Sequence, residues 1–170
     1  VIENGDGATA GIMEGIKGPD FPLGGRVTTD RATLRKIYDE GHGTIKIQAE
    51  WKVEDLPRKQ QIVVTSLPYG VDKGKLEELI GGLIGERKLP QLLNIVNESN
   101  EKEGMRIVME RTAGSDPDLS MAYLYKHTAM QDTFPVNLTC LVPDVNVHGE
   151  TITRPRRLSL KEMLRYFVDF

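Results

Sequence analysis

Residues 44–53 read Thr-Ile-Lys-Ile-Gln-Ala-Glu-Trp-Lys-Val, and this stretch decides the fold class. Apolar side chains stand at the odd positions from Ile45 to Val53, and polar side chains stand at the even positions. Alternation with a period of two predicts a β-strand that has one face in the core and one face toward water or a partner. Residues 61–67 predict a second strand after a turn at 56–59, so we expect a hairpin.

Working outward from this hairpin, helical and strand patterns alternate along the chain. The apolar spacing predicts helices at 8–17, 30–40, 72–84, 117–128 and 160–168. Further strands are expected at 91–96, 105–111, 134–142 and 150–153. This order predicts an α+β fold, a mixed or antiparallel sheet with helices packed on one side.

Two of these helices have apolar stripes that we expect to be buried. The stripe of the third helix consists of Leu76, Leu79, Ile80, Leu83 and Ile84. The stripe of the last helix consists of Leu160, Met163, Leu164, Phe167 and Val168, after a capping box at 159–162.

Length and composition place limits on the kind of protein. The chain has 170 residues, enough for one domain or slightly more, with 39% hydrophobic and 28% charged residues. It has no apolar run of the ~20 residues that span a bilayer and no secretion leader, so we expect a cytoplasmic protein without a membrane partner. A net charge of −3 argues against a protein that coats nucleic acid by charge alone. The start at Val1 and the end inside a helical pattern indicate a piece of a larger polypeptide.

No motif of catalysis or metal binding stands out. The histidines His42, His127 and His148 lack metal-ligand spacing, and Cys140 lies in an apolar strand pattern, which is typical of a small buried side chain. The acidic groups at 77–78 and 98–103 stand among polar residues, where nothing would shift their pKa. We therefore predict no catalytic residue and no metal site in this chain.

The polar face of the 44–53 strand is the best candidate for binding. Lysine and arginine side chains on such a face can follow a phosphate backbone without reading sequence. The alternative is an ordinary solvated strand face. The candidate DNA-backbone contacts are His42, Lys46, Lys52, Arg58, Lys59 and Lys73.

Seven stretches of this sequence, in order, resemble the A subunits of bacterial type IIA DNA topoisomerases, DNA gyrase and topoisomerase IV. They lie at 16–22, 37–46, 62–73, 97–99, 103–108, 124–131 and 158–167. The resemblance covers nearly the whole chain and falls on the tower domain of that family with its immediate flanks. It implies a lead-in helix and loop at 1–22, the tower at 23–158, and at 159–170 the start of the helix leading to the coiled coil.

The resemblance also implies a function. The tower supports the arms of the bent gate DNA through phosphate contacts. The catalytic tyrosine belongs to a preceding region, so none of the five tyrosines here inherits its role, and the piece is expected to be inactive alone. The parent enzyme passes one DNA duplex through another, controlling supercoiling or decatenating, and its partners are the B subunit, a second A subunit, and double-stranded DNA. ATP and magnesium act through that B subunit, and no cofactor is expected in this chain.

The sequence departs from the family at three places. Gly41-His42-Gly43 stands where Gly-Arg-Gly is usual, Gln48 where Arg is common, and residues 70–72 where Gln-Val-Asn is common. Each change removes positive charge or adds negative charge. Two other functions stay open from the residues: a subunit-interaction scaffold that does not touch DNA, and an independent small-molecule enzyme. The sequence leaves gyrase and topoisomerase IV as alternatives.

Overall fold

The computed structural model describes residues 9–102 and 104–169, and it contains two compact units. The described residues of the first unit are 9–19, 29–45 and 133–169, and those of the second unit are 20–28, 46–102 and 104–132. The domain division expected from the resemblance stays a prediction, and its residues 1–8, 103 and 170 lie outside the described part of the chain.

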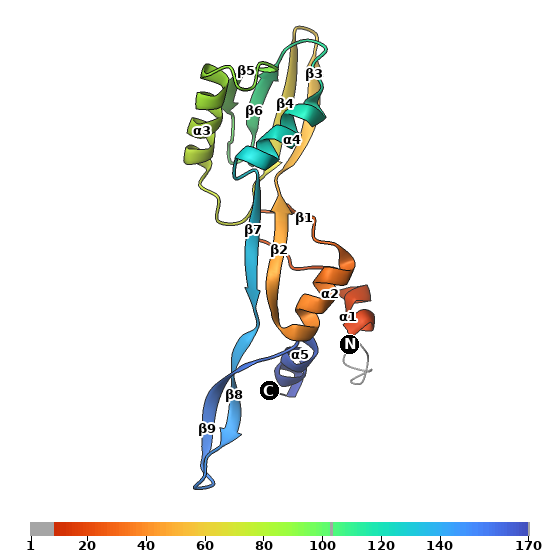
Figure 1. The fold of residues 1–170 in the computed structure, drawn as a ribbon, viewed down its shortest axis with the longest axis vertical. Helices are drawn as coiled ribbons and strands as arrows, with labels where there is room; N and C mark the ends of the chain where they lie inside the picture. Colours follow the sequence, from red (N-terminus) through yellow and green to blue (C-terminus); the bar gives the residue numbers. More distant parts are fainter. Residues whose placement is uncertain (1–8, 103, 170) are drawn as a thin grey trace. The chain divides into compact units, whose positions relative to one another are not determined.

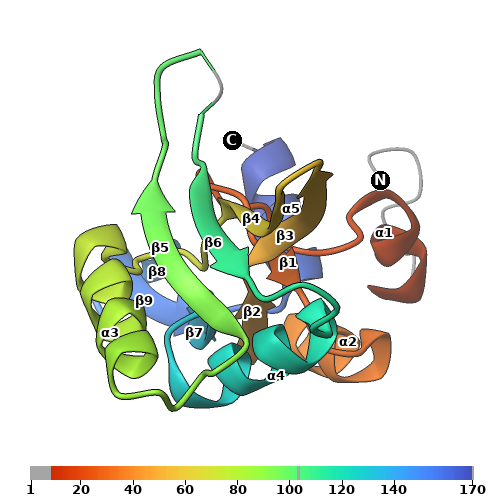
Figure 2. The same cartoon turned by 90° about the horizontal axis from the view of Figure 1, so that it is seen from above.

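A four-stranded antiparallel sheet forms the centre of the second unit. Its strand order is β3-β4-β6-β5, with β3 at Glu50–Leu56, β4 at Lys59–Ser66, β6 at Ile107–Arg111 and β5 at Leu92–Asn97. Helices α3 (Lys73–Gly85) and α4 (Pro117–His127) cover one face of this sheet (Figures 1 and 2). The expected α+β class, with helices on one side of an antiparallel sheet, is confirmed.

The core of this unit lies between the sheet and the two helices. Sheet residues such as Ile62 and Met109 pack with Ile80 of α3 and Leu124 of α4, and all four are fully buried. Asp72 begins α3 by accepting a hydrogen bond from the backbone N–H of Lys75 at 3.0 Å.

The predicted apolar stripe of α3 is only partly right. Leu76 and Ile80 are buried, and Leu83 and Ile84 are partly buried. Leu79, which the pattern places in the core, is 47% exposed. The apolar stripe of α3 is therefore wider than the helix face that packs against the sheet, and Leu79 lies at its uncovered edge.

The strand predicted at 44–53 is wrong as a single element. It is two strands, β2 (His42–Gln48) and β3, which belong to different sheets and are separated by Ala49. Ala49 is 1% exposed, and its N–H donates to the carbonyl of Met130 at 2.7 Å. The side-chain alternation continues through this break, so the sequence pattern does not report the change of partner strand.

A second predicted strand, at 134–142, divides in the same way. It is β7 (Gln131–Asn137) followed by β8 (Thr139–Val145), and β8 pairs with β9 (Thr151–Arg157) in a two-stranded ribbon. Between the two strands, the Leu138 N–H donates to the carbonyl of Gly41 at 2.7 Å. Strand β7 joins β1 (Arg26–Val27) and β2 in a three-stranded sheet of order β1-β2-β7.

The first unit holds helices α1 (Thr9–Gly15), α2 (Arg31–Glu40) and α5 (Leu160–Asp169). The expected helix at 30–40 and the capping box before α5 are confirmed. The expected helix at 8–17 is present as the shorter α1, which ends at Gly15, and position 8 lies outside the described residues. The expected burial of α5 is wrong beyond its first turns, since Phe167 is 81% exposed. An amphipathic pattern identifies side chains that share a face, but it does not require that a neighbour covers them.

Within the described ranges, the structure has no helix that is both long enough and apolar enough to cross a membrane.

Candidate nucleic-acid interface

The sheet face turned away from α3 and α4 carries a set of charged side chains, while Asp55 and Arg111 form an ion pair on the other face. We call the face turned away from the helices the open face. Antiparallel register places alternate residues of each strand on it, in rows such as Lys52–Val63–Val108–Val96 across the four strands. Its charged members are the bases Lys52, Lys59 and Arg106 and the acids Glu54, Glu98 and Glu110.

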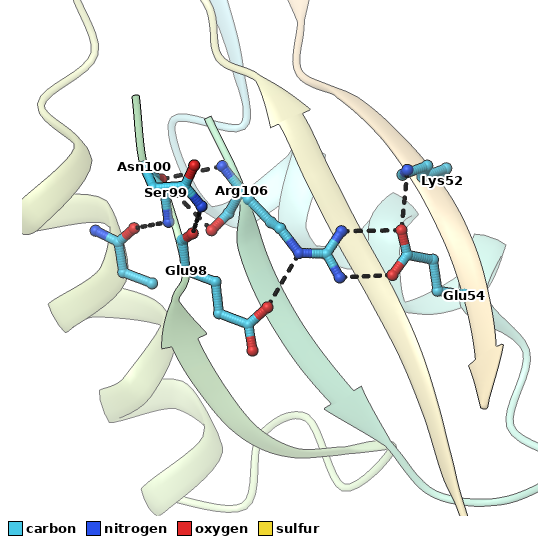
Figure 3. Close-up of polar contacts among 7 residues, drawn as sticks. Lys52, Glu54, Glu98, Ser99, Asn100 and Arg106 are labelled. Atoms are coloured by element: carbon cyan, nitrogen blue, oxygen red, sulfur yellow. Dashed lines mark hydrogen bonds and ion pairs between the residues drawn. The ribbon is translucent and has the colours of Figure 1, made fainter. Parts of the chain in front are cut away.

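Arg106 is the centre of a polar network on this face (Figure 3). Its guanidinium donates through Nη1 and Nη2 to the two carboxylate oxygens of Glu54, at 2.9 and 2.6 Å, and through Nε to Glu98 at 3.0 Å. Lys52 adds an ion pair to Glu54 at 2.9 Å. The bidentate pairing fixes the plane of the guanidinium, so the network is ordered and not a loose surface pair.

The Arg106 side chain passes rows of the sheet that contain apolar side chains. It crosses from the start of β6 over β4 to reach Glu54 on β3, as Figure 3 shows. Val63 and Val108 lie on the same face in the rows that it passes, yet they are 0% and 3% exposed. The methylene stem of an arginine can shield such side chains while its charged group stays at the surface.

The network shifts the ionisation of both partners. Hydrogen bonds from Arg106, and then from Lys52, lower the pKa of the Glu54 carboxyl to about 2. The same contacts, first with Glu54 and then with Glu98, raise the pKa of Arg106 further above its ordinary value. Both groups are therefore charged at neutral pH.

Two of the six predicted DNA contacts, Lys52 and Lys59, lie on the open face. Each is ion-paired, Lys52 to Glu54 at 2.9 Å and Lys59 to Glu110 at 3.9 Å. Arg58 stands at the β3–β4 turn, is exposed, and has no ion pair within the described residues.

The other three predicted contacts lie elsewhere. Lys73 is the first residue of α3 and is half-buried, and Lys46 is exposed on β2. His42 begins β2 in the first unit, and its Nδ1 lies 3.3 Å from the carbonyl oxygen of Glu40. The structure therefore gathers Lys52 and Lys59 on one face and gives no position for His42 relative to them.

Sequence reasoning missed Arg106, the residue that organises the open face. Its partners Glu54 and Glu98 lie 52 and 8 residues away in the chain, and no periodic pattern connects the three. Within the acidic group at 98–103, Glu98 is exposed as expected, and its carboxylate also pairs with Arg106 at 3.0 Å. Glu103 lies outside the described residues.

Reactive groups among the described residues could be a cluster of metal ligands or a tyrosine with a shifted pKa. In residues 9–102 and 104–169, no three or more His, Cys, Asp or Glu side chains converge in a way that could hold a metal ion. Burial raises the pKa of Tyr38 and of Tyr125. Tyr125 serves the core, since its hydroxyl donates to the Ala49 carbonyl and accepts from the Trp51 indole, both at 3.0 Å.

The fold and this face define an α+β module with a charged, open sheet surface and helices behind it. The chain belongs to the A-subunit family of DNA gyrase and topoisomerase IV, whose model matches residues 2–170.

The chain is similar to A subunits of DNA gyrase and to A subunits of topoisomerase IV. The A subunit of DNA gyrase from Clostridium acetobutylicum is 34% identical over 172 residues, which is 100% of this chain and 19% of the relative. The A subunit of DNA gyrase from Thermotoga maritima is 37% identical over 169 residues, 99% of this chain and 20% of the relative. The A subunit of DNA topoisomerase 4 from Caulobacter vibrioides is 38% identical over 143 residues, 83% of this chain and 19% of the relative. The chain spans about a fifth of the length of these curated relatives.

Proposed function

We propose that this chain is the tower part of the A subunit of an ATP-dependent type IIA DNA topoisomerase. In this role it supports the arms of the bent gate DNA through backbone contacts and performs no catalytic step itself. The parent enzyme passes one duplex through another, with a second A subunit completing the assembly, while ATP and magnesium act through the B subunit. The observation that carries the proposal is the family match over residues 2–170.

The physical demands of such a role are modest. Bending a site of 20–30 base pairs costs on the order of 1–6 kcal/mol, and added contacts to phosphates along the arms offset that cost. Those contacts require cations on a rigid scaffold and no reactive group. The ordered network on the open face and the packed core behind it supply the rigid scaffold.

The candidate cations differ in how readily they can meet a phosphate. Arg58 has no ion pair in the described chain, so it offers its full charge. Lys52 and Lys59 can bind a phosphate only by leaving their carboxylate partners or by contacting both groups at once. The cost is small, because exposed ion pairs are worth only about 0–1 kcal/mol. We therefore expect Arg58 to contribute more than Lys59.

A panel of charge-removing variants of the 170-residue chain tests this function. Arg58→Gln, Lys59→Gln and Lys73→Gln are each titrated onto two unrelated duplexes of about 30 base pairs, and Lys75→Gln on the exposed side of α3 serves as the matched control. Removal of a true phosphate contact should weaken binding equally on both duplexes and reduce the slope of log K against log salt by about 0.9. Variants that all behave like Lys75→Gln would contradict the proposal for these residues.

The second candidate is a subunit-interaction scaffold without direct DNA contact. One observation favours it: each of the three bases on the open face is already paired with an acid of that face. The wild-type chain distinguishes the two functions, because a scaffold of this kind would not bind duplex DNA even at low salt.

A further inference from the structure

A short strand places a guanidinium that the sequence did not single out. Strand β1 pairs with β2 in antiparallel register, with Arg26 opposite Gln48 and Val27 opposite Ile47. Paired residues in such a ladder point to the same side of the sheet. Arg26 and Gln48 accordingly meet, and Arg26 Nη2 donates to Gln48 Oε1 at 3.3 Å.

The partner of Arg26 is held in place from its other side. Gln48 Nε2 donates to Gln131 Oε1 at 2.8 Å, which leaves the Gln48 carbonyl oxygen turned to Arg26. Gly25, just before Arg26, has a φ of +88°, and its N–H donates to Ser66 Oγ at 3.0 Å. The backbone and the side chain of Arg26 are thus both positioned by the second unit.

The charge of Arg26 is not neutralised at short range. Its hydrogen-bond partner is a neutral amide, and no carboxylate of the described residues comes within 4.0 Å of it. Arg106 on the open face is the opposite case, since two glutamates occupy its donors. An exposed guanidinium with free donors can bind a phosphodiester in bidentate fashion.

A hollow of about 300 Å³ lies beside Arg26. It is lined by Arg26, Ala49, Glu50, Trp51 and Asp118. The carboxylates of Glu50 and Asp118 oppose an anion inside the hollow, so a phosphate is expected at the rim, on the solvent side of Arg26. The same carboxylates repel a phosphate at the rim and weaken its binding. Removing one of these negative charges should therefore strengthen binding, whereas removing the charge of Arg26 should weaken it.

We infer that Arg26 is a further DNA-backbone contact of this chain. Gln48 holds its side chain in place, and the negative charge of Glu50 weakens its attraction for phosphate. The inference rests on the proposed function, and its ligand is a phosphodiester of duplex DNA bound without regard to sequence.

The test is a fluorescence-anisotropy titration of two unrelated duplexes of about 30 base pairs at several salt concentrations. Arg26→Gln should weaken binding to both duplexes and lower the slope of log K against log salt by about 0.9. The factor by which the binding constant falls between about 50 and about 200 mM salt should then be about 3.5-fold smaller than for the wild type. Arg26→Lys should keep the slope, because the charge remains. Glu50→Gln should tighten binding, and its amide can still accept the hydrogen bond from Ser66.

The matched control is Lys75→Gln, which removes the same charge from α3. Urea unfolding midpoints equal to that of the wild type show that each variant is folded. Wild-type binding that depends on salt, with Arg26→Gln indistinguishable from Lys75→Gln, would overturn the inference and leave the proposed function standing. A wild-type chain that binds neither duplex at low salt would overturn both.

Discussion

At the residue scale, the network around Arg106 explains how a sheet face that lacks a covering helix remains ordered. Its hydrogen bonds and ion pairs connect β3 with the ends of β5 and β6 through Glu54, Glu98 and Lys52. Individual exposed ion pairs contribute little, but a bidentate pair within a network also sets geometry. Loss of Arg106 would remove a charge together with a methylene stem that can shield the apolar side chains in the rows it passes.

The Glu54 carboxyl gives this network a pH dependence. Its pKa in the folded chain is about 2, below its ordinary value of 4.5, so its stabilising effect is fully present above pH 4.5 and is lost as the pH falls toward 2. Glu54→Gln cannot titrate. In urea unfolding, the stability difference between wild type and Glu54→Gln should therefore shrink as the pH is lowered through this window. A difference that stays constant from about pH 6 to about pH 2 would show that the pairing is absent in solution.

Gly41 is a second residue whose identity the fold requires. It ends α2 with a φ of +69°, and a Cβ there would overlap the carbonyl oxygen of Leu158. Gly41→Ala should lower the free energy of unfolding, measured in urea, by roughly 2 kcal/mol or more, through backbone strain and overlap.

Gly82, which is neither strained nor crowded, provides the control for Gly41. Gly82 lies within α3 in ordinary helical conformation, and an added methyl group would meet nothing within 4 Å. Gly82→Ala should raise the free energy of unfolding by about 0.5–1 kcal/mol. Equal effects of the two substitutions would refute the assignment of strain to Gly41.

At the element scale, the sequence predicts the kind of each element better than its extent. The period of two correctly predicts strand at both 44–48 and 50–53, but it does not detect the break at Ala49, where only the partner strand changes. The break at Leu138 is missed for the same reason. The charges of Lys52 and Lys59 could be predicted, whereas their acidic partners on the open face depend on register between strands that are distant in sequence.

Helix α3 depends on the residue that caps its start. The Asp72 side chain accepts from the Lys75 N–H at 3.0 Å and satisfies one of the donors that a helix leaves unpaired there. Asp72→Ala should lower the free energy of unfolding by about 1 kcal/mol, and Asp72→Asn, which keeps a capping oxygen, should lower it by much less. Urea denaturation measures both, and equal losses would mean that the cap is not formed.

At the scale of the whole molecule, the charge is close to balance and its distribution matters more than its total. The chain carries 22 Lys and Arg against 25 Asp and Glu, so attraction to DNA must come from local cations and not from net charge. Arg26 and Arg58 are among the exposed bases without an ion pair in the described part of the second unit, while the bases of the open face are paired. This distribution predicts weak binding, which loss of a cation at the DNA contact should weaken further.

The measurement that tests the proposed role most directly is anisotropy of a labelled duplex of about 30 base pairs, titrated with the wild-type chain at low and at physiological salt. We predict weak binding at low salt that falls steeply as salt rises and is equal on unrelated sequences, because backbone contacts carry it. Absence of binding at low salt, or binding that salt does not change, would contradict the proposed role in supporting DNA.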